Sequence, residues 1–320
     1  MKNAGASERG LKKPIIITAI ILLSILAFLY LLIMVTNVIS YFDGKNVKTR
    51  QIEYISSLRK KYESGDYIPV DEQSFCSFDL SKADEISYQQ VRFLATHNSY
   101  KGKESKYSRI INGILASITD NGWESFAYYF DNLTAQLNSG LRSLEFDAYA
   151  RRDGTFEGSH HPIMDKSGHA YELSLAFEEL AMWSDNNPGH LPITILLEPK
   201  GWYIPLNGHD FEIPDYINMD NLIKEVFGDK LYTPKDMLGN YSDFEQMRLD
   251  NGWPSLEKLR GKFIFMLHPN KRMLKYFKLH PDMTTAAMFP AYDRRDVKLS
   301  KEQLKLTCFA ISNFPLTDTE

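Results

Sequence analysis

The feature that most constrains this chain is an apolar run near its N-terminus, residues 14–35, which contains no charged residue. As a helix with a rise of 1.5 Å per residue the run is about 33 Å long, enough to cross a hydrocarbon core of roughly 30 Å. A cleaved signal peptide is the alternative, but its apolar region is usually shorter, about 7–15 residues, and ends in small residues. Thr36-Asn37-Val38 follows the run here. We therefore expect an uncleaved transmembrane anchor over residues 14–36.

The charges that precede this run predict its orientation. Four basic residues stand before it against one acidic residue: Lys2, Arg9, Lys12 and Lys13 against Glu8. Basic residues beside a membrane span are retained on the cytoplasmic side. We therefore expect a single-pass membrane protein with residues 1–13 in the cytoplasm and everything after about residue 40 outside it.

Residues 37–87 are expected to be a juxtamembrane stalk that leads into the folded domain. Residues 45–63 predict a helix there, because apolar side chains recur at helical spacing. These side chains are Ile52, Ile55, Leu58 and Tyr62. The charged residues between them indicate a solvated surface with no chemistry of its own.

The remainder of the chain has the composition of a folded domain. Apolar residues make up 43% of the sequence and charged residues 24%, which excludes a disordered chain. With 37 basic and 41 acidic residues the net charge is -4, so no overall field attracts a nucleic acid. The two cysteines, Cys76 and Cys308, exclude a cysteine-built zinc site and leave room for one disulfide.

Short β-rich runs alternate with helical patterns from residue 88 onward. Strands are predicted over residues 91–96, 143–149, 155–159, 193–197, 262–267, 286–290 and 306–311. Helices are predicted over residues 123–139, 171–186 and 220–227. This alternation is typical of parallel strands with crossover helices, so we expect an α/β fold, a TIM-like (β/α) barrel over residues 88–320. The usual barrel has eight strands, so either two strands are merged in this count or the barrel is incomplete at the C-terminus.

Polar side chains lie at the ends of four successive predicted strands, where the loops of such a barrel build its active site. They are His97 and Asn98, Glu145 and Asp147, His160 and His161, and Glu198 and Lys200. Residues two apart on a strand point to the same face, so Glu145 and Asp147 both face the barrel interior. Each residue alone would be an ordinary loop residue or salt-bridge partner. Their coincidence at four strand ends favours a site.

The proposed donors of this site are one amide oxygen and three carboxylates. They belong to Asn98, Glu145, Asp147 and Glu198. Neighbouring carboxylates repel each other unless they share a cation or a proton. Oxygen donors without cysteine suit Ca²⁺ or Mg²⁺ better than Zn²⁺. Histidines at the neighbouring strand ends would flank the metal, a position suited to acid–base work or to charge stabilisation.

Several motifs, in this order along the chain, resemble a known family. Three are similar to the X-region of phosphoinositide-specific phospholipases C: Thr96-His97-Asn98-Ser99-Tyr100, Ser143-Leu144-Glu145-Phe146-Asp147 and His160-His161-Pro162. Others resemble the calcium-dependent phosphoinositide phospholipase C family of bacteria and fungi: Met182-Trp183-Ser184-Asp185, Leu197-Glu198-Pro199-Lys200 and Asn251-Gly252-Trp253-Pro254. The resemblance covers roughly residues 88–316.

This resemblance implies a role for each site residue. The Ca²⁺ ligands would be Asn98, Glu145, Asp147 and Glu198. His97 would stabilise the phosphoryl oxygens, and His160 would protonate the leaving glycerol oxygen. The family pattern reads His-x-Pro, which favours His160 and leaves His161 as the alternative. Glu145 is expected to be the general base, and Lys200 either holds a phosphate or forms a salt bridge at the barrel rim.

The reaction implied is attack of the inositol 2-hydroxyl on the phosphate of a phosphatidylinositol-type lipid. It would cleave the glycerol–phosphate bond and give diacylglycerol and a cyclic inositol phosphate. The sequence departs from the family in two ways. Cysteines that often accompany the His-x-Pro region are absent, and residues 308–316 resemble the segment before the family's last helix and closing strand. The second departure again predicts a barrel that is cut short.

Two other functions fit parts of the pattern. A glycerophosphodiester phosphodiesterase is also a barrel with two carboxylates and two histidines around a divalent metal. It would be expected to carry His-Arg-Gly where His97-Asn98-Ser99 stands here. The other is a membrane-tethered lipid-phosphate-binding protein without catalysis, against which the retention of both histidine positions and all four metal donors argues.

Overall fold

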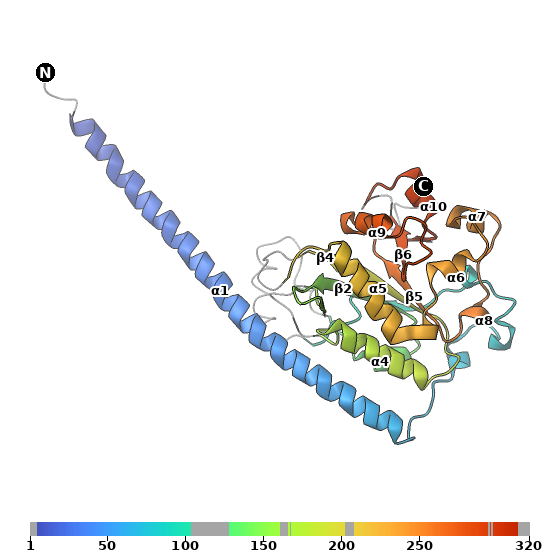
Figure 1. Ribbon diagram of the computed structural model, residues 1–320. Helices are drawn as coiled ribbons and strands as arrows, with labels where there is room; N and C mark the ends of the chain where they lie inside the picture. The colour runs from blue at the N-terminus through green and yellow to red at the C-terminus, as the bar shows by residue number, and fades with distance from the viewer. Residues whose placement is uncertain are drawn as a thin grey trace.

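The structure is a computed structural model that describes residues 5–103, 128–160, 166, 168–201, 208–293, 295 and 297–312. It consists of an α/β body and one long helix, α1 (Gly5–Glu63), that projects far beyond it (Figure 1). The predicted seven strands are all present within these residues. They are β1 (Ala95–Thr96), β2 (Ser143–Ala150), β3 (Phe156–Gly158), β4 (Ile193–Lys200), β5 (Phe263–Leu267), β6 (Met288–Tyr292) and β7 (Phe309–Ala310).

The strands form a sheet in the order β1-β2-β4-β5-β6-β7, and every pair along this path is parallel. The predicted α/β fold is confirmed, as a parallel half-barrel rather than a closed barrel: in the described part of the chain β1 and β7 end the path. The expectation that the third strand is a parallel barrel strand is wrong, because β3 runs antiparallel to β2. Only residues 151–155 join the two strands, and a parallel pair needs a crossover of a dozen or more residues.

Short helices connect and cover the strands. They are α3 (Leu133–Asn138), α4 (Leu173–Asp185), α5 (Ile213–Phe227), α6 (Pro234–Leu238), α7 (Phe244–Leu249), α8 (Leu256–Leu259), α9 (Leu274–Leu279) and α10 (Lys301–Lys305). Single 3₁₀ turns occur at Glu72–Phe75, Leu80–Lys82, Tyr88–Gln90, Gly228–Lys230 and Lys271–Met273. The prediction for α4 is confirmed, whereas α5 begins earlier than expected because Pro214 is tolerated in a first helical turn. Of the helix predicted over 123–139, the part before residue 128 lies outside the described residues.

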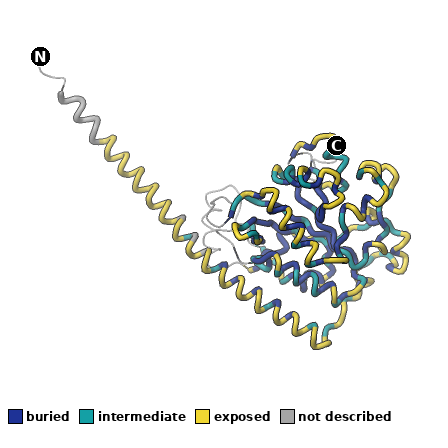
Figure 2. The backbone as a smooth tube through the Cα atoms, viewed as in Figure 1, coloured by how far each residue is buried: buried dark blue, intermediate teal, exposed yellow. Residues whose placement is uncertain are grey.

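The core lies between the sheet and its helices (Figure 2). Helix α4 packs directly on the sheet. The Phe177 ring of α4 is 5.3 Å from the Phe265 ring of β5 and 6.2 Å from the Phe146 ring of β2, measured between centroids. Both cysteines are free thiols, so no disulfide links Cys76 to Cys308. The body is therefore held together by apolar packing and by buried polar contacts.

Along the apolar run of α1 most described residues are exposed (Figure 2), and the large side chains among them are apolar. Its most apolar window has a mean hydropathy of 3.0, and none of that window is buried against the body. Length and composition make this helix able to cross a membrane, and an N-terminal signal sequence would satisfy the same criterion.

The second half of α1 differs from the expected solvated stalk, because residues 45–63 pack against the body. Val47, Ile55 and Leu58 are buried, whereas Ile52, predicted to share their apolar face, is 45% exposed. This half of the helix lies against α4. The helix is also continuous from the apolar run into this packed part, with no break at residue 36.

Candidate active site

Three carboxylates meet at the carboxyl ends of β2 and β4. Asp147 of β2 lies directly opposite Glu198 of β4 in the sheet, and Glu145 precedes Asp147 by two residues on the same face. One oxygen from each of the three lies within 4.8 Å of the others. The parallel register therefore brings together residues that the sequence separates by fifty positions.

The three carboxylates repel one another because they lie close together. Burial, followed by repulsion from Asp147 and Glu198, raises the pKa of Glu145 to about 7. Lys200 of β4 offsets part of this repulsion, with its Nζ 2.7 Å from Glu198 Oε2 and 3.3 Å from Asp147 Oδ1. Burial disfavours the ammonium group, but these two carboxylates outweigh it and raise the pKa of Lys200. Lys200 thus forms the salt bridge that was one of its two expected roles.

The cluster has the size and chemistry of a calcium site. Calcium–oxygen distances are about 2.3–2.6 Å, so two ligand oxygens on opposite sides of the ion are up to about 5 Å apart. The 4.8 Å spread of the three carboxylates fits within that limit. All donors are oxygens, and the mutual repulsion that raises the pKa of Glu145 is what a divalent cation would relieve.

Asn98 lies beside this cluster in a loop whose backbone is unusual. Its φ is +52°, a left-handed conformation that asparagine adopts more readily than most residues. The side chain is buried, and its Oδ1 accepts a hydrogen bond of 2.9 Å from the Tyr100 hydroxyl. The Tyr100 hydroxyl also lies 2.9 Å from Asp147 Oδ2. Tyr100 thus links two of the predicted ligands, and burial, followed by repulsion from Asp147, raises its pKa.

Sequence reasoning assigned no role to Tyr100, although it lies inside a motif that carried the family resemblance. It also missed the buried network below the loop. The Ser99 hydroxyl accepts from the Glu145 backbone amide at 2.8 Å, and the Gln136 side chain donates to the Ser99 carbonyl at 2.7 Å. These bonds tie the loop after β1 to the strand that carries the carboxylates. The signal available in the sequence was the motif itself, since isolated Ser and Tyr residues are common in loops.

The two histidines differ in how far their side chains are exposed to solvent, 71% for His97 and 31% for His160. His160 follows β3, and its Nδ1 lies 3.0 Å from Asp147 Oδ2. His97 follows β1, with a side chain that is 71% exposed and an Nε2 that is 3.7 Å from Glu145 Oε2. His161, the alternative to His160, lies outside the described residues. Within the described part of the chain, the structure brings together every other residue that the sequence assigned to the site.

Comparison with known proteins bears directly on this arrangement. Residues 155–298 match the sequence model of the family described as phosphoinositide phospholipase C, Ca²⁺-dependent. This part of the chain belongs to the calcium-dependent phosphoinositide phospholipase C family. The resemblance inferred from the sequence motifs is confirmed, and the family's known dependence on Ca²⁺ agrees with the acidic cluster.

Solved structures confirm the fold. A calcium-dependent phosphoinositol-specific phospholipase C from a Gram-negative bacterium, Pseudomonas sp., in its apo form is 21% identical, with a TM-score of 0.51 over 71% of this chain and 76% of that one. A second structure of an enzyme with the same description, this time as a myoinositol complex, is 20% identical to this chain. Its TM-score is 0.52, and the match covers 73% of this chain and 78% of that one. No curated protein matches the chain.

Proposed function

We propose that this protein is a membrane-anchored, calcium-dependent phospholipase C that acts on phosphatidylinositol-type lipids. The observation that carries the proposal is the contact of Asp147 with both His160 and the carboxylate cluster. This contact supports the proposal because a candidate acid and oxygen donors suited to a divalent cation then lie close together at the carboxyl end of the sheet. The family match over residues 155–298 supports the reaction class.

The proposed Ca²⁺ ligands are Glu145, Asp147, Glu198 and Asn98. When bound, Ca²⁺ supplies charge neutralisation at the phosphate and lowers the pKa of the inositol hydroxyl. The protein's own part is to aim these oxygens at one point, which the β2–β4 register and the loop after β1 achieve.

The remaining roles are assigned to single side chains. Glu145 takes the proton from the inositol 2-hydroxyl, because its carboxylate belongs to the cluster beside which the ion and that hydroxyl would lie. His160, oriented through Nδ1 by Asp147, protonates the leaving glycerol oxygen. His97 donates to the phosphoryl oxygens. Lys200, paired with Asp147 and Glu198, would hold a substrate phosphate only after exchanging one of these partners.

The proposal extends to location. Residues 14–36 are assigned to a transmembrane anchor, with residues 1–13 in the cytoplasm and the catalytic part, residues 88–320, outside it. The continuity of α1 supports an anchor, because the apolar run leads without interruption into a helix that the body holds in place. A nucleic acid is not expected as a partner, given the net charge of -4.

The test is to incubate the purified full-length chain with phosphatidylinositol vesicles and to identify the products. Diacylglycerol together with inositol 1,2-cyclic phosphate is expected, with loss of activity in a calcium chelator and recovery on adding Ca²⁺. Recovery with Mg²⁺ should be weaker, because that ion is smaller and demands octahedral geometry. Cleavage of glycerophosphoinositol alone would identify a glycerophosphodiester phosphodiesterase. Binding without turnover would identify an inactive lipid-phosphate-binding protein, and full activity in excess chelator would remove the metal from the mechanism.

A further inference from the structure

The packed half of α1 runs along the body in the direction opposite to the strands. Near its beginning, Lys48 Nζ lies 2.9 Å from Glu172 Oε1, and Glu172 Oε2 accepts from Arg151, the residue directly after β2. After its end, Tyr67 reaches Asn187, which precedes β4. The start of the packed half is therefore at the carboxyl edge of the sheet, and its end is at the amino edge.

The rise of the helix per residue gives the distance of each part of α1 from the end of the anchor. If the anchor ends at Thr36, Lys48 lies about 18 Å farther along the helix axis and Glu63 about 40 Å. The carboxylate cluster lies at the edge that Lys48 marks. The candidate site is thus at the end of the body nearer to the bilayer, and the amino edge of the sheet points away from it.

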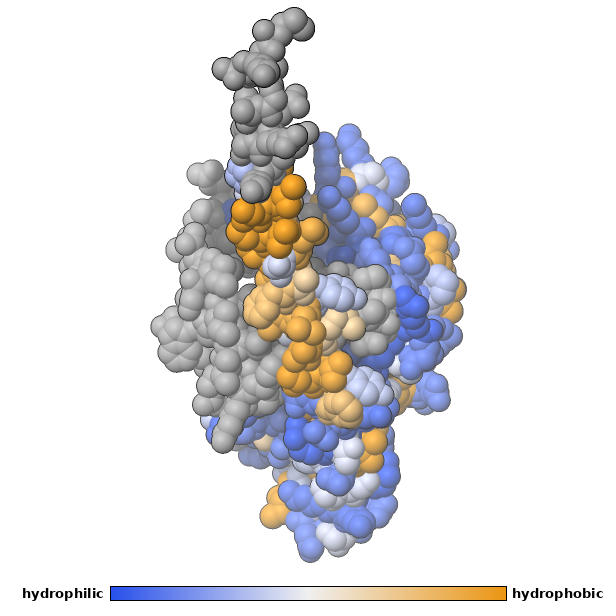
Figure 3. Space-filling view, turned by 90° about the vertical axis from the view of Figure 1, so that its left-hand side faces the viewer, coloured by the Kyte–Doolittle hydropathy of each residue, from blue (hydrophilic) through white to orange (hydrophobic). Residues whose placement is uncertain are grey.

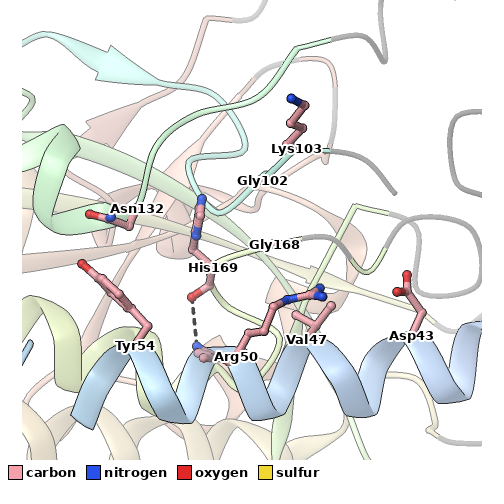
Figure 4. A pocket seen from close by; sticks show the side chains of 10 residues that line it. Asp43, Val47, Arg50, Tyr54, Gly102, Lys103, Asn132, Gly168 and His169 are labelled. Carbon is pink, nitrogen blue, oxygen red and sulfur yellow. Dashed lines mark hydrogen bonds between the residues drawn. The ribbon is translucent and has the colours of Figure 1, made fainter. Parts of the chain in front are cut away.

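The packed half is held firmly enough to fix this orientation. Gln51 is buried, and its Nε2 donates to the carbonyls of His169 and Glu172 while its Oε1 accepts from the Glu172 amide, all at 2.9–3.0 Å. Figure 4 shows Tyr54 and Arg50 of α1 facing Asn132 and His169 of the body across one pocket. A side-chain amide with three backbone partners resists both rotation and sliding of the helix.

The surface next to the apolar run is suited to a lipid headgroup region. Tyr41 and Phe42 are 47% and 60% exposed at its end, where aromatic side chains favour the membrane interface. Lys45 and Lys48 of α1 line a pocket together with Arg151, Arg152 and Lys166 of the body. The pocket therefore has five basic residues and three acidic ones. In Figure 3 hydrophobic side chains gather on the projecting helix, and the described surface of the body beside it is mostly hydrophilic.

We propose that α1 is a rigid bracket that points the carboxyl edge of the sheet toward the bilayer in which α1 is embedded. The partner of this face is the surface of that same membrane, and the site takes its lipid from there. The proposal rests on the membrane anchor and lipid substrate proposed above. It adds that the reach of the domain is set by the length of helix between the apolar run and Gly44, where the body approaches so closely that a Cβ would lie 2.7 Å from the Tyr171 hydroxyl.

The first experiment lengthens the bracket. Fourteen helix-forming residues inserted between Asp43 and Gly44 should move the body about 21 Å outward. In proteoliposomes, cleavage of phosphatidylinositol in the same bilayer should fall at least tenfold, while cleavage of dispersed short-chain phosphatidylinositol stays within twofold. The same insertion between Gly65 and Asp66, after the end of α1, is the matched control and should leave both rates unchanged. Equal bilayer activity of the two insertion variants would overturn the bracket. Loss of the short-chain activity already in the unaltered chain would instead overturn the proposed function.

The second experiment does not depend on enzymatic activity. In a Cys76→Ser/Cys308→Ser background, a fluorophore is attached at Asp153→Cys in the turn after β2, or at Glu257→Cys in α8 before β5. Quenchers carried on lipid headgroups should reduce the emission at position 153 several-fold more than at position 257. Equal or reversed quenching overturns the proposed orientation. Failure of the chain to stay with the vesicles overturns the anchor on which it depends.

Discussion

At the scale of single residues, the candidate site converges on Asp147. Its side chain is 1% exposed, and its two oxygens contact Tyr100, His160 and Lys200. A carboxylate buried this deeply is tolerated because each of these groups can donate to it or carries positive charge. One residue therefore connects the proposed metal site with the proposed acid.

Asp147→Asn should weaken Ca²⁺ binding at least tenfold, because it removes one negative charge from the cluster at almost constant volume. The fold should persist, since an amide can still pair with Tyr100. Calorimetric titration with Ca²⁺ measures the affinity. Asp153→Asn, an exposed carboxyl group in the turn after β2, is the matched control and should bind Ca²⁺ as the unaltered chain does. Equal affinities of the two variants would place the ion elsewhere.

The histidines should separate by the leaving group of the substrate. His160→Ala should cost on the order of 10²–10⁴ in rate with a natural lipid, and less with a nitrophenyl ester that needs no protonation. His97→Ala should slow both substrates alike, because charge on the phosphoryl oxygens develops whatever departs. His161→Ala should leave both rates within a few fold. If His161→Ala rather than His160→Ala shows the leaving-group dependence, the acid is the neighbouring residue and the metal site is unaffected.

At the scale of elements, α4 is packed between the sheet on one side and α1 on the other, with a buried carboxyl group at the contact. Glu179 is 1% exposed and accepts from the Thr134 amide at 2.7 Å and from the Tyr54 hydroxyl of α1 at 3.1 Å. Burial raises the pKa of Glu179 to about 7, despite these hydrogen bonds. We therefore expect the contact between α1 and α4 to depend on pH.

Because the folded-state pKa of Glu179 lies above its unfolded value of 4.5, this group stabilises the fold fully below pH 4.5 and less as the pH rises through 7. The loss should reach about 3 kcal/mol by pH 8. Glu179→Gln keeps both hydrogen-bond acceptor contacts and should flatten the dependence of the free energy of unfolding on pH between 5 and 8. Denaturant unfolding at several pH values measures it. Glu178→Gln changes the adjacent, partly exposed residue, which pairs with Arg59 of α1, and it should retain the slope. Identical slopes in both variants would assign the pH dependence to other groups.

At the scale of the whole molecule, residues 44–63 belong to the folded body even though they continue the apolar helix. Three apolar side chains on this segment are buried against the body, Val47, Ile55 and Leu58. Without the segment, the face of α4 that it covers would be exposed to water. Stability of the body should therefore depend on where a truncation is made.

A chain that begins at residue 44 should fold and unfold cooperatively, whereas a chain that begins at residue 64 should be less stable by about 5 kcal/mol or aggregate. The estimate takes the lower end of the about 1.5–3 kcal/mol that each of the three buried side chains contributes. Thermal unfolding of the two truncated chains tests it. Equal transition temperatures would show that α1 adds no stability and lies only loosely on α4.

Features that depend on a local pattern could be predicted from the amino-acid sequence. The uncharged run predicts a long apolar helix, the two-residue spacing of Glu145 and Asp147 places them on one strand face, and the alternation of strand and helix patterns predicts a parallel α/β sheet. These follow because side-chain direction along a strand or helix is a property of a few neighbouring residues. The polar residues at the predicted strand ends supplied the candidate ligands, and the motifs added the family and a role for each residue.

Which distant segments contact each other could not be predicted in this way. The short connection between β2 and β3 excludes a parallel pair of these two strands, but the pairing of β3 with β2 rather than with another strand depends on the whole sheet. Gln51 counts as a polar surface residue in any helical pattern, yet it is buried because the start of α4 supplies partners for its amide. Tyr100 likewise contacts Asp147, which is 47 residues away in the sequence and lies within hydrogen-bond distance of its hydroxyl. Partners across strands and helices are set by register and by the packing of the whole body, and no local period in the sequence encodes them.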